Sequence, residues 1–121
     1  MYCTSHCISL STNAGISMDK IEHIDEFETN EHFTEGERAA LRVARNANQI
    51  PNAVTDSDFE KLKEHYEDNS IVEIMSLICM MSFYNKWNDT MNTIVEGPAY
   101  EASSKVSWWK AGKHNPSLIN H

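Results

Sequence analysis

The sequence predicts an all-α protein. Three observations favour this class: apolar residues recur at helical spacing along most of the chain, capping residues precede these stretches, and no segment alternates apolar and polar residues as a half-buried strand does. A length of 121 residues suits one domain with a real hydrophobic core. We therefore expect a bundle of about five helices.

The first two predicted helices lie close to the start of the chain. One covers residues 3–14 and stops at Gly15, a residue type that favours the left-handed conformation found at helix ends. Ser17 is a suitable cap for a second helix over 18–27, in which isoleucines and a methionine recur on one face.

Two capping patterns predict the next two helices. Thr34 and Glu37 have the spacing of a capping box, in which each side chain accepts a hydrogen bond from the other residue's backbone amide, and they open a helix over 35–48. Thr55 caps a fourth helix, with Asp58 at its third position.

The longest predicted helix runs from Ile71 to Thr93. Its first half is apolar on nearly every side, and a helix of that kind must be buried all round. A single chain of this size rarely encloses such a helix, so we expect it to form a subunit interface in a homo-oligomer. Cys79, inside the apolar stretch, is interpreted as a core residue. Asn85 and Asn88 share one face and are expected to make hydrogen bonds in helix packing.

The Gly97-Pro98 pair predicts the end of this helical pattern. We expect one helical domain over residues 1–95 and a tail over 96–121, which carries Trp108 and Trp109. The tail is expected to pack loosely or on a neighbouring subunit, and its last residues are expected to be disordered.

The charge and the cysteine content exclude several classes of protein. The formal net charge of -8 argues against binding to nucleic acid or to an anionic membrane surface, since both require basic patches. No run of 18 apolar residues and no secretory signal pattern is present, so we expect a cytoplasmic protein. Three cysteines is an odd number, and in a reducing compartment a closely spaced pair indicates redox or metal chemistry.

Two of the three cysteines flank a histidine in the segment Cys3-Thr4-Ser5-His6-Cys7. A helix N-terminus favours the thiolate form of Cys3, and His6 lies one turn away, where it can pair with that thiolate. A thiolate that attacks a peroxide becomes a sulfenic acid, which Cys7 can then convert to a disulfide. The first turn has to loosen for this, because Cβ atoms four residues apart in a helix are about 5–6 Å apart and a disulfide needs about 3.5–4.5 Å.

Two other interpretations of this segment remain open. Cys3 and Cys7 can be ordinary packing residues, since cysteine behaves as a small hydrophobic side chain. They can also join His6 as zinc ligands, but structural zinc takes four ligands, and the fourth would have to come from a distant part of the chain or from another subunit.

Three further segments resemble the carboxymuconolactone decarboxylase family, which includes the alkylhydroperoxidase D-like proteins. Phe33-Thr34-Glu35-Gly36-Glu37-Arg38-Ala39-Ala40-Leu41 is similar to a helix start of that family. Two downstream blocks follow in the family's order, Ala53-Val54-Thr55-Asp56-Ser57-Asp58-Phe59-Glu60-Lys61-Leu62 and Ser82-Phe83-Tyr84-Asn85-Lys86-Trp87-Asn88-Asp89. The resemblance covers roughly residues 2–95 and implies an alkylhydroperoxidase D-like helical bundle.

The family's redox site reads C-x-x-C-x-x-x-H. Cys3 matches its second cysteine, His6 matches a histidine that some members carry, and Cys7 stands where the family has its last histidine. The family's first cysteine and its proton-relay glutamate would both precede Met1. The chain therefore resembles a short member of the family.

The resemblance implies a thiol-dependent peroxidase or disulfide reductase with an antioxidant role. Cys3 would be the nucleophile, Cys7 the resolving thiol and His6 the proton acceptor or donor. The substrate would be a hydroperoxide, the electrons would come from an external dithiol without a bound cofactor or metal, and assembly as a trimer or hexamer would use the long helix. The alternatives are a non-catalytic oligomeric member that has lost the site, and a lactone decarboxylase, for which the chain offers no clear arginine pair.

Overall fold

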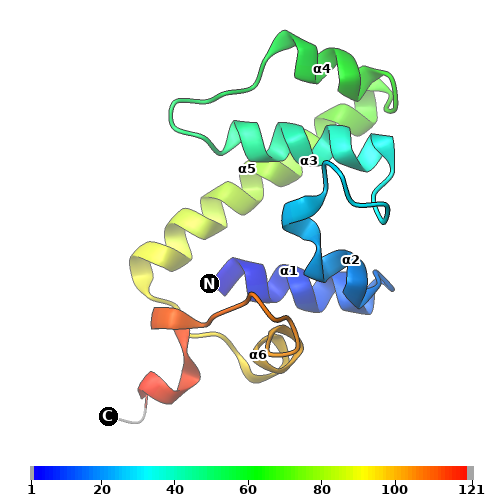
Figure 1. The fold of residues 1–121 in the computed structure, drawn as a ribbon. Helices are drawn as coiled ribbons and strands as arrows, with labels where there is room; N and C mark the ends of the chain where they lie inside the picture. Colours follow the sequence, from blue (N-terminus) through cyan, green and yellow to red (C-terminus); the bar gives the residue numbers. More distant parts are fainter. Residues whose placement is uncertain (1, 120–121) are drawn as a thin grey trace. The chain divides into compact units, whose positions relative to one another are not determined.

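The computed structural model describes residues 2–119, and in this part of the chain the regular elements are all helices, without a β-strand (Figure 1). The described α-helices are α1 (Tyr2–Asn13), α2 (Met18–Glu22), α3 (Glu35–Ala47), α4 (Asp56–Lys63), α5 (Asp68–Met91) and α6 (Gly97–Ser103). Three short 3-10 turns accompany them, η1 (Ile24–Glu26), η2 (Gly112–His114) and η3 (Pro116–Ile119). The all-α prediction is confirmed.

The predicted ends of the first helices are confirmed in part. Gly15 has φ +85° and ends α1, and the backbone amide of Ile16 donates to the oxygen of Ser11 at 3.0 Å. Ser17 caps α2 by accepting from the amide of Lys20. The prediction of one helix over 18–27 is wrong, because α2 ends at Glu22, where the ring of the following residue, His23, contacts the oxygen of Asp19 at 2.7 Å.

The described chain divides into two compact units. Unit 2 is the continuous segment Glu26–Ser82, and unit 1 combines the residues up to Asp25 with those from Phe83 onward. The long helix α5 contributes its first part to unit 2 and its last nine residues, 83–91, to unit 1. The predicted division into a domain over 1–95 and a tail over 96–121 stays a prediction.

Unit 2 is organised by two helix caps around a small core. The predicted capping box of Thr34 and Glu37 is present at the start of α3, and the predicted cap Thr55 forms a second capping box with Asp58 at the start of α4. The core behind them is formed by apolar side chains of α3, α4 and α5, namely Ala39, Val43, Leu62 and Ile71.

Arginines of α3 fix the chain that precedes it. Arg42 and Arg45 both bind the carboxylate of Glu28, with nitrogen–oxygen distances of 2.6 and 3.0 Å. Arg38 donates to the backbone oxygens of Phe27 and Asn30. These contacts hold the non-helical segment between η1 and α3 against the helix.

Unit 1 is built on the packing of α1 against α6. Ser103 of α6 is fully buried, and its hydroxyl donates to the backbone oxygen of Ala99 at 2.7 Å and to that of Ser5 at 3.3 Å. The surrounding core contains apolar residues from α1, α2 and the C-terminal segment, namely Ile8, Ile21, Val95, Ala99, Val106, Trp109 and Ala111.

The segment after residue 96 is folded, so the prediction of a loosely packed tail is wrong. Gly97 and Pro98 begin α6 rather than ending a helical region, because proline in a first helical turn lacks only an amide hydrogen that has no helical partner there. Trp109 is buried edge-on against the ring of Tyr100, with the ring centroids 5.6 Å apart. Disorder is expected for the last residues of the chain, and residues 120–121 among them lie outside the described residues.

Helix α5 carries an unusual number of exposed apolar side chains in the single chain. Cys79 is exposed in the single chain, so its interpretation as a core residue is wrong. The large exposed apolar residues of α5 are Val72, Leu77, Met80, Phe83, Tyr84, Trp87 and Met91. The subunit interface expected here stays a prediction.

Candidate functional site

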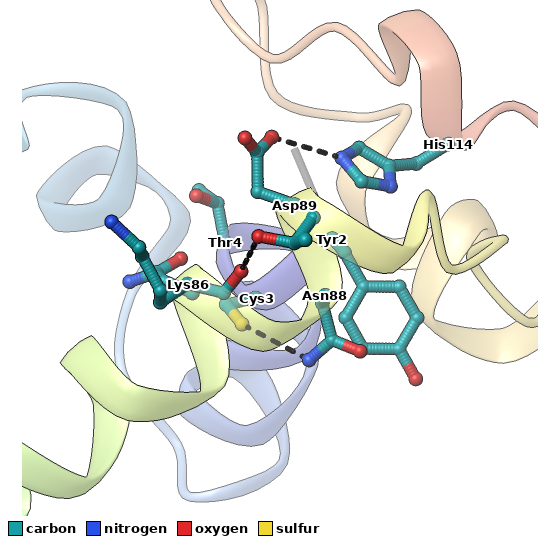
Figure 2. A pocket seen from close by; sticks show the side chains of 9 residues that line it. Tyr2, Cys3, Thr4, Lys86, Asn88, Asp89 and His114 are labelled. Carbon is teal, nitrogen blue, oxygen red and sulfur yellow. Dashed lines mark hydrogen bonds and ion pairs between the residues drawn. The ribbon is translucent and has the colours of Figure 1, made fainter.

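Cys3 lies in the first turn of α1, and its thiol is free and only 6% exposed. It lines a cavity of ≈ 410 Å³ within unit 1 (Figure 2). The other lining residues come from α1, the end of α5 and η2, and they are Tyr2, Thr4, Asn85, Lys86, Asn88, Asp89, Thr90 and His114. A buried thiol that opens on a cavity is placed to react with a bound small molecule.

Asn88 is directed at the sulfur of Cys3. Its Nδ2 lies 3.0 Å from the backbone oxygen of Tyr84, which can only accept, so this contact fixes which end of the amide is nitrogen. The same Nδ2 donates toward the Cys3 sulfur at 3.7 Å. A donated hydrogen bond stabilises the sulfur when it carries negative charge. Asn88 is predicted to make hydrogen bonds in helix packing, and one of its contacts is with Cys3, the predicted nucleophile.

His6 is held on the turn above Cys3 by contacts that the sequence did not indicate. Its Nε2 lies 2.8 Å from a carboxylate oxygen of Glu96, and its Nδ1 lies 3.2 Å from the backbone oxygen of Tyr2. The ring also packs against the ring of Tyr2 in a tilted arrangement, with centroids 4.4 Å apart. His6 is not among the residues that line the cavity.

Glu96 joins His6 and Tyr2 into a polar cluster. The Tyr2 hydroxyl donates to Glu96 at 2.8 Å. Burial alone would raise the pKa of Glu96, but the hydrogen bonds from Tyr2 and from its own backbone amide, together with His6, outweigh burial and lower it. Burial and the same carboxylate raise the pKa of Tyr2 to about 12. Tyr2 therefore remains a neutral donor at physiological pH.

Cys7 follows Cys3 by one turn, and its thiol is free and exposed. Although its side chain reaches solvent, neighbouring atoms remove part of its hydration, and this burial, followed by the nearby charge of Cys3, raises the pKa of Cys7. Cys7 therefore resists ionisation, which suits a second thiol better than a first nucleophile. The proposed catalytic roles of Cys3, His6 and Cys7 remain predictions.

A second polar cluster, formed by Asp89, Lys113 and His114, lies at the cavity. Lys113 binds Asp89 at 3.0 Å, and this hydrogen bond and charge lower the pKa of Asp89. His114 is buried and places Nε2 3.7 Å from Asp89 (Figure 2). This cluster and Glu96 could not be predicted from the sequence, because the segment from residue 96 onward has no periodicity that would place it near α1.

Neither a metal-binding cluster nor a membrane-spanning helix is found in the part of the chain that the structure describes. Among residues 2–119, no three histidine, cysteine or carboxylate side chains are grouped so that they could hold a metal ion. Within the same residues, none of the helices combines the length and the apolar character that a membrane-spanning segment requires.

Comparison with known proteins gives one informative similarity. The sequence matches no protein-family model and no curated protein. The structure is similar to that of the debrominase Bmp8 in its apo form, with a TM-score of 0.76 and 29% sequence identity over 84% of this chain and 55% of that one. It is equally similar to a cysteine-to-alanine variant of Bmp8 in complex with 2,3,4-tribromopyrrole, with a TM-score of 0.77 and 28% identity over 86% and 56%.

The similarity is confined to part of the other protein. This chain spans about half of the length of Bmp8. Both neighbours are described as a debrominase, and the one in complex with 2,3,4-tribromopyrrole carries a cysteine-to-alanine substitution. The fold is thus one that also occurs in an enzyme.

Proposed function

We propose that the protein is a thiol-dependent reductase in which Cys3 is the nucleophile. The observation that carries this proposal is a buried thiol that opens on a cavity of ≈ 410 Å³ and has an amide N–H donor directed at its sulfur. A side chain kept only for packing would need neither the cavity nor the donor. The similarity to Bmp8, studied as a cysteine variant, supports a reactive cysteine in this fold.

The first substrate class that we propose is hydroperoxides, with an antioxidant role. The Cys3 thiolate attacks the outer peroxide oxygen, a sulfur–oxygen bond forms, the oxygen–oxygen bond breaks and an alcohol leaves. The Cys7 thiol then displaces water from the sulfenic acid and forms a disulfide, which an external dithiol reduces. In this scheme His6, held by Glu96, exchanges a proton with the cysteine pair.

Reductive dehalogenation is a second candidate, favoured by the similarity to a debrominase complex that contains 2,3,4-tribromopyrrole. Here the two thiols supply two electrons, hydrogen replaces bromine on the ring, bromide and a proton leave, and the thiols become a disulfide. This chemistry uses the same pair, Cys3 and Cys7, and the same external dithiol. The two candidates therefore differ in the substrate and share the thiol mechanism.

Thiol counting on the purified protein tests the shared mechanism. We expect one equivalent of cumene hydroperoxide, or of a polybrominated pyrrole with bromide release as readout, to consume two thiols per chain, and dithiothreitol to restore them. Cys3→Ser should abolish the reaction. Cys79→Ser is the matched control, because this exposed thiol lies on α5 away from the cavity lining, and it should react as the unmodified protein does.

The outcomes separate the candidates from the remaining alternatives. Reaction with only one of the two probes selects the substrate class. Loss of no thiol with either probe would contradict the proposal and would favour a non-catalytic protein that keeps the fold. Activity that survives Cys3→Ser would contradict the assignment of the nucleophile and would leave lactone decarboxylation as a possibility to assay.

We also propose that the chain forms a homo-oligomer, a trimer or hexamer, through α5. The exposed apolar residues of this helix, which include Leu77 and Phe83, support an interface, because a patch of this kind on a lone chain favours association. Sedimentation should show an oligomer, and Leu77→Glu should reduce it to a monomer. A monomeric unmodified protein would contradict this proposal.

A further inference from the structure

The cavity that contains Cys3 has a histidine that the thiol scheme above does not use. His114, at the end of η2, is buried and lines the same cavity, on a segment different from both α1 and α5 (Figure 2). A buried titratable side chain at a reactive thiol is a candidate for proton transfer.

The surroundings of His114 determine which of its nitrogens can exchange a proton. Nδ1 lies 2.6 Å from the backbone oxygen of Thr93, and because a carbonyl can only accept, Nδ1 carries the hydrogen in this contact. The backbone oxygen of His114 accepts from the amide of Val95 at 3.0 Å, which fixes the residue at a second point. Nε2 is therefore the nitrogen with a lone pair available to accept a proton.

One carboxylate lies near this nitrogen, and other polar groups line the same cavity. Asp89 of α5 lies 3.7 Å from Nε2, and Lys113 next to His114 binds the same carboxylate. The ring of Tyr2 lies 6.3 Å from that of His114, measured between centroids, and Lys86 and Cys3 also line the cavity. The Asp89 carboxylate, whose pKa is lowered, is ionised at neutral pH and can stabilise a protonated imidazole.

We infer that His114 is the general acid of the cavity and that it protonates the group that leaves when Cys3 attacks. This inference rests on the proposed hydroperoxide chemistry. Nε2 first takes the proton of the Cys3 thiol, directly or through water. The thiolate then attacks the outer peroxide oxygen, the oxygen–oxygen bond breaks, and the alkoxide that leaves takes the proton from Nε2. The products are a sulfenic acid and an alcohol, with no net change in charge.

His6 is less well placed for this step. The residue is not part of the cavity lining, whereas His114 is. His114 thus serves the step in which Cys3 attacks the peroxide, and His6 serves the later step in which Cys7 forms the disulfide.

Leaving-group dependence tests this inference. An alkoxide that leaves from tert-butyl hydroperoxide needs a proton in the transition state, whereas the carboxylate that leaves from peracetic acid does not, so a general acid accelerates only the first reaction strongly. The rates are measured in a Cys7→Ser, Cys79→Ser background, in which Cys3 is the one remaining thiol, by trapping its sulfenic acid with dimedone and detecting the adduct by mass spectrometry.

His114→Asn is the most informative variant, because the asparagine amide can still donate to Thr93 and has no nitrogen that accepts a proton. We expect it to slow the reaction with tert-butyl hydroperoxide by about 100-fold, within the range typical of general acid–base catalysis, and the reaction with peracetic acid by only a few-fold. His114→Gln, measured in parallel, should show the same selectivity. His6→Asn should change both rates by a similar factor.

Equal losses with the two oxidants, or no loss, in both His114 variants would overturn the inference. The ratio of the two rates is formed within each variant, so partial destabilisation cancels. The proposed function has its own test. It fails if Cys3 in the unmodified protein reacts with tert-butyl hydroperoxide no faster than free cysteine does. The ratio of the rates with the two oxidants can still be measured in that case.

Discussion

The two compact units differ in how far apart along the chain their decisive contacts lie. In unit 2 the helix starts depend on partners three residues apart, as in the hydrogen bond between Thr55 and Asp58. In unit 1 the contact between Asn88 and Cys3 spans 85 residues, and that between Tyr2 and Glu96 spans 94. Local contacts define the helices of one unit, whereas distant contacts assemble the candidate site of the other.

The largest expected effect concerns the core of unit 2. Leu62 is 0% exposed, and Leu62→Ala should lower the free energy of unfolding by about 3 kcal/mol, because it removes buried apolar contacts and leaves a cavity. Urea denaturation followed by circular dichroism measures the change. Leu10→Ala is the matched control, since Leu10 is 67% exposed, and it should change stability by at most about 0.5 kcal/mol. Equal effects of the two substitutions would contradict a core centred on Leu62.

A smaller effect is expected at the cap of α4. The buried carboxylate of Asp58 accepts hydrogen bonds from the amide of Thr55 at 2.9 Å and from the side chain of Asn46 at 3.1 Å. Asp58→Ala should therefore cost about 2 kcal/mol at neutral pH. Asp56→Ala removes an exposed carboxylate from the same helical turn and should cost about 0.5 kcal/mol or less.

The stability that Asp58 contributes should depend on pH in a definite direction. The hydrogen bond from the backbone of Thr55 opposes the effect of burial and, with Asn46 and Arg42, lowers the pKa of Asp58. Folding therefore favours the carboxylate, so its contribution is complete above the unfolded pKa of about 3.9 and disappears as the pH falls through the lower folded value. The difference in stability between the unmodified protein and Asp58→Ala should shrink on acidification. A difference that stays constant down to about pH 2 would contradict this account.

The smallest effect is a shift in the reactivity of Cys7. Its pKa is raised first by burial and then by the charge of Cys3, so the rate of alkylation by iodoacetamide should reach half of its maximum at a higher pH than for free cysteine. Cys3→Ser removes only the second cause and should move this midpoint partway back. A midpoint unchanged by Cys3→Ser, measured in a Cys79→Ser background, would show that the two thiols do not interact.

The same contrast explains how much could be predicted from the sequence. The caps at Thr34 and Thr55 and the stop at Gly15 were predictable, because each depends on residues only a few positions apart. The chemistry expected of the segment that contains Cys3 rests on its residue types and stays a prediction. Glu96 and His114 were not predictable, because they reach the site only through the packing of α6 and η2, which leaves no periodic pattern in the sequence.

The tryptophans have a practical consequence for all of these measurements. Trp87, Trp108 and Trp109 are the three tryptophans of the chain, and all of them lie in unit 1. Their ultraviolet emission is therefore an intrinsic optical reporter of the unit that contains Cys3. We expect unfolding of this unit, and with it loss of the candidate site, to change this emission, which requires no dye and no modified cysteine.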